Sequence, residues 1–399
     1  MSSSLAWLDH DSAARDRSLR ILALFREKET RDELGIGAVR DAIADQLFPG
    51  TSTIQTRLRY FLFVPWVYQR LENERVPPEA FAARARRLEL DLVQPLLTHA
   101  DQAGVFGRQA GGGLKRLPSM VYWAGLGAWG IRRFDLSQDE YHRSIGQIYW
   151  RRDHRAGSAA DDSDVNRAVV TWHSRLPPAP PGFPEKVTLA LTTAEAEFLL
   201  DRIVTSCPDS LLAHLALNGR VEAVDFPWEH PGFAGLRDDH QALLIQARRF
   251  SEVMHGAALL YNLLLAELED LRDLVDAHRE AFGEWATGLD LAELRGWDLN
   301  TLWATVIGHG YTVTPATRRF IETWIHLAVG SPGALPGHAE ARELVRRREL
   351  ALKQARSRFT TAQARKQWGG YAGLGRHAYR WLNAQRLLND LHAGLGRGV

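Results

Sequence analysis

The chain has 399 residues, of which 45% are hydrophobic and 24% charged, and its formal net charge is +1. This composition is typical of a folded protein and excludes global disorder, and the near-neutral charge means that any basic binding surface has to be local. The single cysteine, Cys207, excludes an intramolecular disulfide and fits a reducing compartment.

The start of the chain contains early acidic residues and no apolar segment of the kind found in secretory signals. No stretch approaches the roughly 20 apolar residues that span a bilayer. We therefore expect a cytoplasmic protein without membrane contact.

Apolar residues at helical spacing predict helices along most of the chain. The predicted helical segments are 11–27, 35–47, a second helix after the turn at 48–53, 118–131, 192–205, 238–274 and 338–366. Thr192 and Glu195 form a capping-box pattern before one of them. Strand signals are few, with Lys186–Leu191 the best and Tyr311–Val313 the second. We expect a mainly α, multi-helical fold with few short strands.

Three breaks divide the chain: the small and acidic residues 155–165, the proline-rich residues 176–184 and the segment Gly330 to His338. They predict an N-terminal helical domain at 1–154, a central helical domain at 185–329 and a C-terminal basic region at 337–399. The proline-rich stretch is expected to be a linker or a long loop.

The first candidate site lies where the turn FPGTST, residues 48–53, precedes the second helix. A hydroxyl residue there can cap the helix, and free N–H groups with nearby arginines suit a phosphate, as does the second helix of a helix–turn–helix. A capped core helix is the alternative, and Pro65 is expected to kink or end that helix. The candidate contacts are Thr51, Ser52, Thr53, Gln55, Arg57 and Arg59.

The second candidate is a stretch without acidic residues between Asp101 and Asp135, which we call the basic segment. The triglycine run 111–113 allows close backbone approach to a ligand but does not match a phosphate-binding P-loop. A mobile basic loop before a helix opened by Pro118 resembles the wing of a winged-helix protein, and equally an ordinary surface loop. Its five cations are Arg108, Lys115, Arg116, Arg132 and Arg133.

The third candidate is the predicted basic helix from Ala339 to Trp368, which has a net charge of +6. Phosphates attract such a stripe, but acidic helices elsewhere in this near-neutral chain can also offset it. The candidate contacts are Arg346, Arg347, Arg348 and Lys353.

A fourth candidate is enzymatic. Arg249 and His255 lie six residues apart on one predicted helix and resemble the Arg-x4–6-His pattern of helical HEPN ribonucleases, although Phe250 replaces the usual polar residue. The resemblance implies proton transfer by the histidine and charge stabilisation by the arginine. A histidine satisfied within the core is the alternative.

No other catalytic motif, zinc pattern or calcium loop is present, so we expect no cofactor and no metal. The 13 tryptophans leave a protein–protein scaffold open as a further hypothesis, because aromatic residues often anchor interfaces.

The chain resembles a family of uncharacterised bacterial proteins of similar length. The resemblance is carried by WLD at Trp7–Asp9, RDELGIGAVRD, LFPGTSTIQTR, PSMVYWAGLGAWGI, FSEVMHGAALLYN and RKQWGGYAGLGRHAYRWLNAQRLLND, and it covers essentially the whole chain. It supplies no catalytic residues. It implies a genomic setting among anti-phage defence genes, beside helicases and phospholipase-D-like nucleases.

Together these observations predict a non-enzymatic subunit of a bacterial defence system that binds nucleic acid, with DNA favoured over RNA, and acts with helicase or nuclease partners. The helical ribonuclease and the scaffold without nucleic-acid binding remain the two alternatives.

Overall fold

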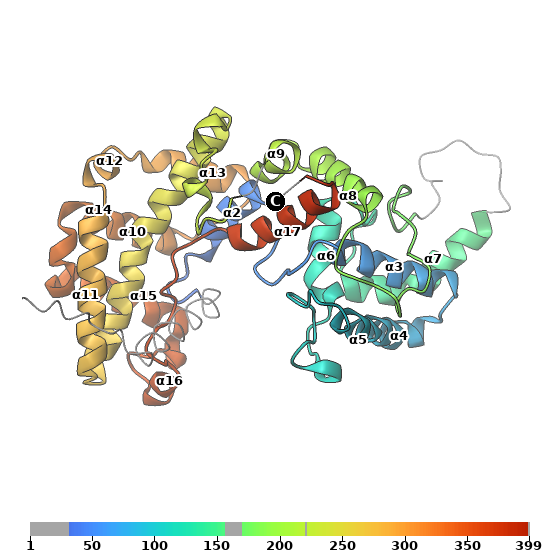
Figure 1. The fold of residues 1–399 in the computed structure, drawn as a ribbon. Coiled ribbons are helices and arrows are strands. Elements are labelled where there is room, and N and C mark those ends of the chain that lie inside the picture. Colours follow the sequence, from blue (N-terminus) through green and yellow to red (C-terminus); the bar gives the residue numbers. More distant parts are fainter. Residues whose placement is uncertain (1–31, 156–169, 220–221, 398–399) are drawn as a thin grey trace, which may run out of the picture. The chain divides into compact units, whose positions relative to one another are not determined.

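The structure is a computed structural model that describes residues 32–155, 170–219 and 222–397. These residues form sixteen α-helices, and their one β feature is an isolated bridge between Arg132 and Trp172 (Figure 1). The prediction of a mainly α, multi-helical fold is confirmed. The predicted strands Lys186–Leu191 and Tyr311–Val313 are wrong, because both segments are irregular. No strands therefore form a wing in the described N-terminal part.

The chain folds as two compact units that do not follow sequence order. The first consists of Met1–Ile43 and Gln241–Tyr379, and the second of Ala44–His240 and Arg380–Val399. The sequence predicted three consecutive domains instead. The predicted helix at 11–27 and nearly all of the break at 155–165 lie outside the described residues.

The first unit contains the start of α2 (Gly37–Leu47) and most of α10 (Asp238–Leu268). Its remaining helices are α11 (Arg272–Gly288), α12 (Leu291–Arg295), α13 (Leu299–Gly308), α14 (Pro315–Gly330), η5 (Pro332–Gly337), α15 (Ala339–Lys353), η6 (Gln354–Arg356) and α16 (Ala362–Lys366). The single helices expected at 238–274 and 338–366 are thus each interrupted.

Two indoles fix neighbouring helices onto α10 in this unit. Trp285 of α11 donates to the carbonyl of Glu252 at 2.7 Å, and Trp324 of α14 donates to that of Val253 at 2.9 Å. A Cβ atom at Gly256 would lie only 2.2 Å from the Trp285 ring, so glycine permits this close approach. The two rings stack on each other with centroids 6.4 Å apart.

The second unit contains the rest of α2 and a set of helices that ends with the last helix of the chain. They are α3 (Tyr60–Asn73), α4 (Pro78–Asp91), α5 (Val93–Leu97), η1 (Gly111–Gly113), α6 (Pro118–Ala128), α7 (Gln138–Arg155), α8 (Thr193–Ser206), α9 (Leu211–Asn218), η3 (Pro227–Glu229), η4 (Phe233–Gly235) and α17 (Trp381–Gly394). Pro118 opens α6 and the Thr192–Glu195 capping box opens α8, as predicted.

Helix α3 is the core of this unit, because every residue from Tyr60 to Tyr68 is buried. Phe61 stacks on Trp129 with ring centroids 3.9 Å apart. The helix continues past Pro65 to Asn73, so of the two expectations for this proline the helix end is wrong, and the kink stays a prediction. An apolar helix buried on all sides is a natural centre for a helical domain.

The proline-rich stretch belongs to this core rather than to a linker between the units. The carbonyl of Pro177 accepts a hydrogen bond from the Trp66 indole at 2.7 Å. Phe183 lies edge-on to the same indole, with centroids 5.5 Å apart. Of the two expectations, the long loop is therefore correct.

A carboxyl group is buried between α4 and α6 in this unit. Glu89, only 1% exposed, accepts hydrogen bonds at 2.7 Å from both the backbone N–H and the hydroxyl of Ser119. Burial raises the pKa of Glu89 to about 7, although the Ser119 hydrogen bonds favour the ionised form.

We expect the Glu89→Gln variant to gain stability over the wild type as the pH rises. The folded-state pKa of about 7 lies above the ordinary value of 4.5, so the contribution of Glu89 to stability is full below pH 4.5 and is lost as the pH passes 7. Melting temperatures at pH 5.5 and 8.5 measure the effect, and the gap between variant and wild type should widen at the higher pH. Glu79→Gln, at an exposed position of the same helix, is the control. An equal gap at both pH values would contradict this account.

Candidate functional site

The turn FPGTST closes on itself instead of capping a helix. The Thr51 hydroxyl donates to the carbonyl of Phe48 at 2.6 Å, and the Gln55 side chain bonds both the N–H of Ser52 and the carbonyl of Gly50. Thr53 is exposed. Helix α3 starts later, at Tyr60, after Arg59 as an N-cap without a side-chain hydrogen bond. The predicted cap by a hydroxyl residue is therefore wrong, and no helix N-terminus lies at this turn.

Arg57 is bound on all sides by acceptors within the second unit. Its Nε lies 3.0 Å from both carboxylate oxygens of Asp390 in α17, and one Nη lies 2.6 Å from Asp101. Asp390 also accepts the backbone N–H of Leu58 at 2.8 Å. Burial alone would lower the pKa of Arg57, but the two carboxylates outweigh it and raise that pKa. The guanidinium is thus a structural tie to the last helix.

Arg59 is a second buried tie. Its guanidinium lies 2.7 Å from Glu195 of α8 and 2.9 Å from the carbonyl of Thr188, and the residue is 5% exposed. The same Glu195 forms the capping box of α8. A cation held in this way is not presented to a phosphate in solution. For this pair of arginines the geometry matches the core alternative that the sequence left open.

In contrast to Arg57 and Arg59, the cations in the first part of the basic segment are exposed to solvent. Arg108, Lys115 and Arg116 are exposed, and the described residues offer their side chains no hydrogen bond or ion pair. The backbone around them is anchored: Gly104 accepts the Thr56 hydroxyl at 2.6 Å, and the N–H of Phe106 reaches the Tyr60 hydroxyl at 3.0 Å. We call residues 104–117 the basic loop.

Helix α4 adds arginines beside the basic loop. Arg86 donates to the carbonyl of Leu114 at 3.1 Å, and Arg87 next to it is exposed. Sequence reasoning missed both, although the pattern ARARR at 83–87 is a visible signal of a basic helix face. Gly111 has a φ of +49° and open space where a Cβ would lie, so the loop backbone stays uncovered there.

The two cations at the end of the basic segment differ from each other. Arg132 folds back onto the carbonyls of Phe134 and Leu136, and its guanidinium lies over the Trp123 ring at 5.4 Å. Burial lowers the pKa of Arg132. Arg133 is exposed and lines a shallow hollow together with Asp135. Arg132 is therefore structural, and Arg133 sits beside a carboxylate.

The predicted basic helix of the C-terminal region has its charges largely offset. It breaks at Gln354 into α15, η6 and α16. Arg348 is buried and donates to the carbonyls of Leu34 at 2.7 Å and Gly35 at 2.8 Å, while Arg347 pairs with Glu343. Lys353 binds Glu33.

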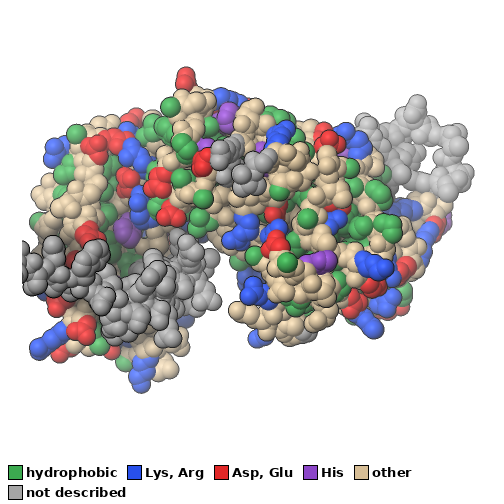
Figure 2. All heavy atoms as spheres, viewed as in Figure 1, with side chains coloured by type: hydrophobic (Ala, Val, Ile, Leu, Met, Phe, Trp, Pro, Cys, Tyr) green, Lys and Arg blue, Asp and Glu red, His purple; other side chains and the backbone are tan. Residues whose placement is uncertain are grey.

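Of the four candidates in that region, only Arg346 is exposed without a carboxylate partner among the described residues, and it lies over the Phe359 ring. Figure 2 likewise shows cations and carboxylates interspersed over most of the face in view. These contacts agree with the offset interpretation of the basic helix.

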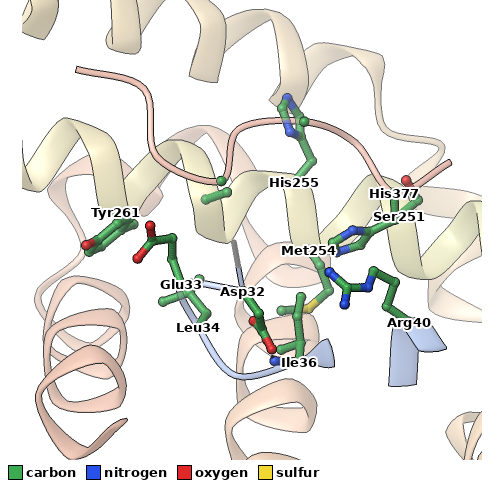
Figure 3. Close-up of a pocket in the computed structure, with 13 residues that line it drawn as sticks. Asp32, Glu33, Leu34, Ile36, Arg40, Ser251, Met254, His255, Tyr261 and His377 are labelled. Atoms are coloured by element: carbon green, nitrogen blue, oxygen red, sulfur yellow. Dashed lines mark hydrogen bonds between the residues drawn. The ribbon is translucent and has the colours of Figure 1, made fainter. Parts of the chain in front are cut away.

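In the structure, the two residues of the enzymatic candidate, Arg249 and His255, have separate surroundings. Arg249 donates to Glu293 at 2.8 Å, whereas His255 lines a small pocket of the first unit that does not include Arg249. Figure 3 shows Ser251, Met254 and His255 of α10 at this pocket, with His377 and with Arg40 of α2.

The pocket holds two histidines that stay neutral. Burial, together with a smaller effect of nearby arginines, lowers the pKa of His255 to about 4 and that of His377 to about 3. The hydroxyl of Ser251 and Nδ1 of His255 are buried without a hydrogen-bond partner among the described atoms. The cavity measures about 30 Å³, which is room for a water molecule or two and too little for a nucleotide.

The described residues contain neither a metal-binding cluster nor a membrane-spanning helix. No group of three or more His, Cys, Asp and Glu side chains there is placed to hold a metal ion. None of the helices in those ranges combines the length and apolarity that crossing a membrane requires.

Residues 1–394 match the model of a family of unknown function, DUF6361. The chain belongs to this family. Comparisons with curated proteins and with solved structures found no match. Membership in DUF6361 agrees with the resemblance seen in the sequence and assigns no residue a role.

We expect Arg57→Ala to destabilise the protein by about 3–5 kcal/mol, because it leaves the carboxylate of Asp390, whose side chain is only 11% exposed, without its partner. Urea denaturation followed by circular dichroism measures the change. The control is Arg347→Ala, which removes an exposed pair and should cost less than about 1 kcal/mol. Equal effects of the two substitutions would show that the Arg57 tie is not structural.

Proposed function

We propose that this chain binds nucleic acid through the basic loop and the adjoining arginines of α4. The observation that supports the proposal is a contrast within one unit. Arg57 and Arg59 form ion pairs with carboxylates. Arg108, Lys115 and Arg116 are exposed and unpaired among the described residues. Exposed, unpaired cations retain their full attraction for an anionic polymer.

The chemistry of the basic loop suits the phosphate backbone rather than one base sequence. Lysine and arginine side chains contact phosphates, and a glycine-rich backbone such as Gly111–Gly113 can approach a strand closely. Within the described loop the one helical element is the three-residue η1, and no strand pair forms there. We therefore expect binding with little sequence preference and strong salt dependence.

The setting implied by the sequence resemblance extends this proposal. We infer a cytoplasmic, non-enzymatic subunit of a bacterial anti-phage system that holds DNA for helicase or nuclease partners. The helical ribonuclease alternative receives no support from the geometry, since Arg249 is bound to Glu293 outside the pocket of His255. The scaffold alternative predicts partner binding without any affinity for nucleic acid.

We expect the triple variant Arg108→Ala, Lys115→Ala, Arg116→Ala to bind nucleic acid at least tenfold more weakly at moderate salt. Loss of three phosphate contacts should also reduce the slope of log K against log salt by roughly 2–3. Fluorescence anisotropy with labelled DNA and RNA over a salt series measures both quantities.

The control removes three exposed arginines from the first unit, Arg272, Arg295 and Arg319, and changes net charge equally. Its affinity should stay near that of the wild type. A wild-type protein that binds neither DNA nor RNA at low salt overturns the proposal and favours the scaffold. Equal losses in the two triple variants would show that total charge, not the basic loop, sets the affinity.

A further inference from the structure

Helix α7 of the second unit presents a large aromatic side chain to solvent. Trp150 is 60% exposed, although most tryptophans of the described chain are buried. The opposite face of the helix is packed inward through Tyr141, Ile145 and Ile148. An exposed indole on a well-packed helix has no role in the core, and its exposure therefore needs a separate explanation.

The indole is held in place by its own helix. The His154 ring stacks on Trp150 with centroids 4.2 Å apart and planes 28° from parallel, and its Nδ1 lies 2.9 Å from the Trp150 carbonyl. This contact restricts the rotation of the indole. A flat, ordered and exposed ring loses little entropy when another flat ring stacks on it.

The surroundings of Trp150 are cationic. Arg151 is exposed next to Trp150, Arg143 lies two turns earlier on the helix and interacts with Glu140, and Asp153 is bound by Arg75. The carboxylates Asp139 and Glu140 lie in the first turn of α7, about 15 Å away along the helix axis. The chemistry around the ring favours an anionic partner with flat, stackable groups.

Helix α4 connects this region to the basic loop. At one end, Pro78 lies against Gly146 of α7 and Arg75 pairs with Asp153. Arg86, about 12 Å further along the helix axis, donates to Leu114 of the loop. Arg84 and Arg87 are exposed along this stretch. Helix α4 therefore contacts both the basic loop and α7 within the second unit.

We infer that Trp150 is a stacking platform for a base of single-stranded nucleic acid. In a duplex the bases are already stacked inside the helix, whereas an unpaired base offers its π-face to an aromatic side chain. The inference rests on the proposed function and deepens it: the basic loop supplies affinity for the backbone of either form, and Trp150 adds preference for single strands.

The test compares Trp150→Ala with the wild type by fluorescence anisotropy on three labelled probes. They are an oligothymidylate, a duplex of the same length and an abasic single strand of that length. We expect the substitution to weaken oligothymidylate binding at least about fivefold, the lower end of the effect of one stacked base. Affinity for the duplex and for the abasic strand should not change, because neither presents a free base.

Two further variants complete the design. Trp150→Phe keeps a flat ring and should restore most of the oligothymidylate affinity. Ile307→Ala, which removes an equally exposed apolar side chain from the first unit, should change nothing. Circular dichroism confirms that each variant is folded.

The outcomes separate this inference from the proposed function. Equal loss on all three probes, or no loss on any, overturns the stacking role and would favour a protein contact at Trp150. A wild-type protein that binds the duplex but not the oligothymidylate keeps the proposed function and refutes the platform. Absence of all binding refutes both.

Discussion

The second unit depends on two ion pairs, the largely buried pair of Arg57 with Asp390 and the buried pair of Arg59 with Glu195. A buried guanidinium is tolerated only when carboxylates and carbonyls satisfy it, so these residues have to recruit acceptors from distant parts of the chain. They thereby fix α17 and α8 against the start of the apolar helix α3. The same need for acceptors decides which cations remain available to a ligand. Cations that bind carboxylates or carbonyls inside the fold are structural, and those on the basic loop are exposed.

Interactions between residues that are close in the sequence could be predicted from the sequence. The Thr192–Glu195 capping box, the helix opened by Pro118 and the helix before the FPGTST turn all form as the residue pattern indicates. Helix α3 begins later than the residue pattern indicates, because the Thr51 hydroxyl donates to the carbonyl of Phe48 instead of accepting a helix N–H. The segment Lys186–Leu191 has strand propensity but no partner to pair with in the described chain.

The site could be predicted only in part for the same physical reason. Asp390 lies 333 residues after Arg57, and no periodicity links the two. The sequence therefore does not show that this arginine forms an ion pair. The exposed state of Arg108, Lys115 and Arg116 follows from a glycine-rich loop without acidic residues, and that feature was visible. Trp150 was counted among 13 tryptophans, and only the packing shows that this indole faces solvent. The two neutral histidines at the pocket of the first unit belong to a site too small for a nucleotide.

We propose that packing divides the cations of this chain into a structural set and a ligand-binding set. Photo-crosslinking of the whole protein to a thymidine-rich oligonucleotide carrying photoreactive bases, followed by mass spectrometry of the linked peptides, tests it most directly. We expect crosslinks in the basic loop and around Trp150, and none at Arg57, Arg59 or Arg348. Crosslinks concentrated at these three buried arginines would contradict it.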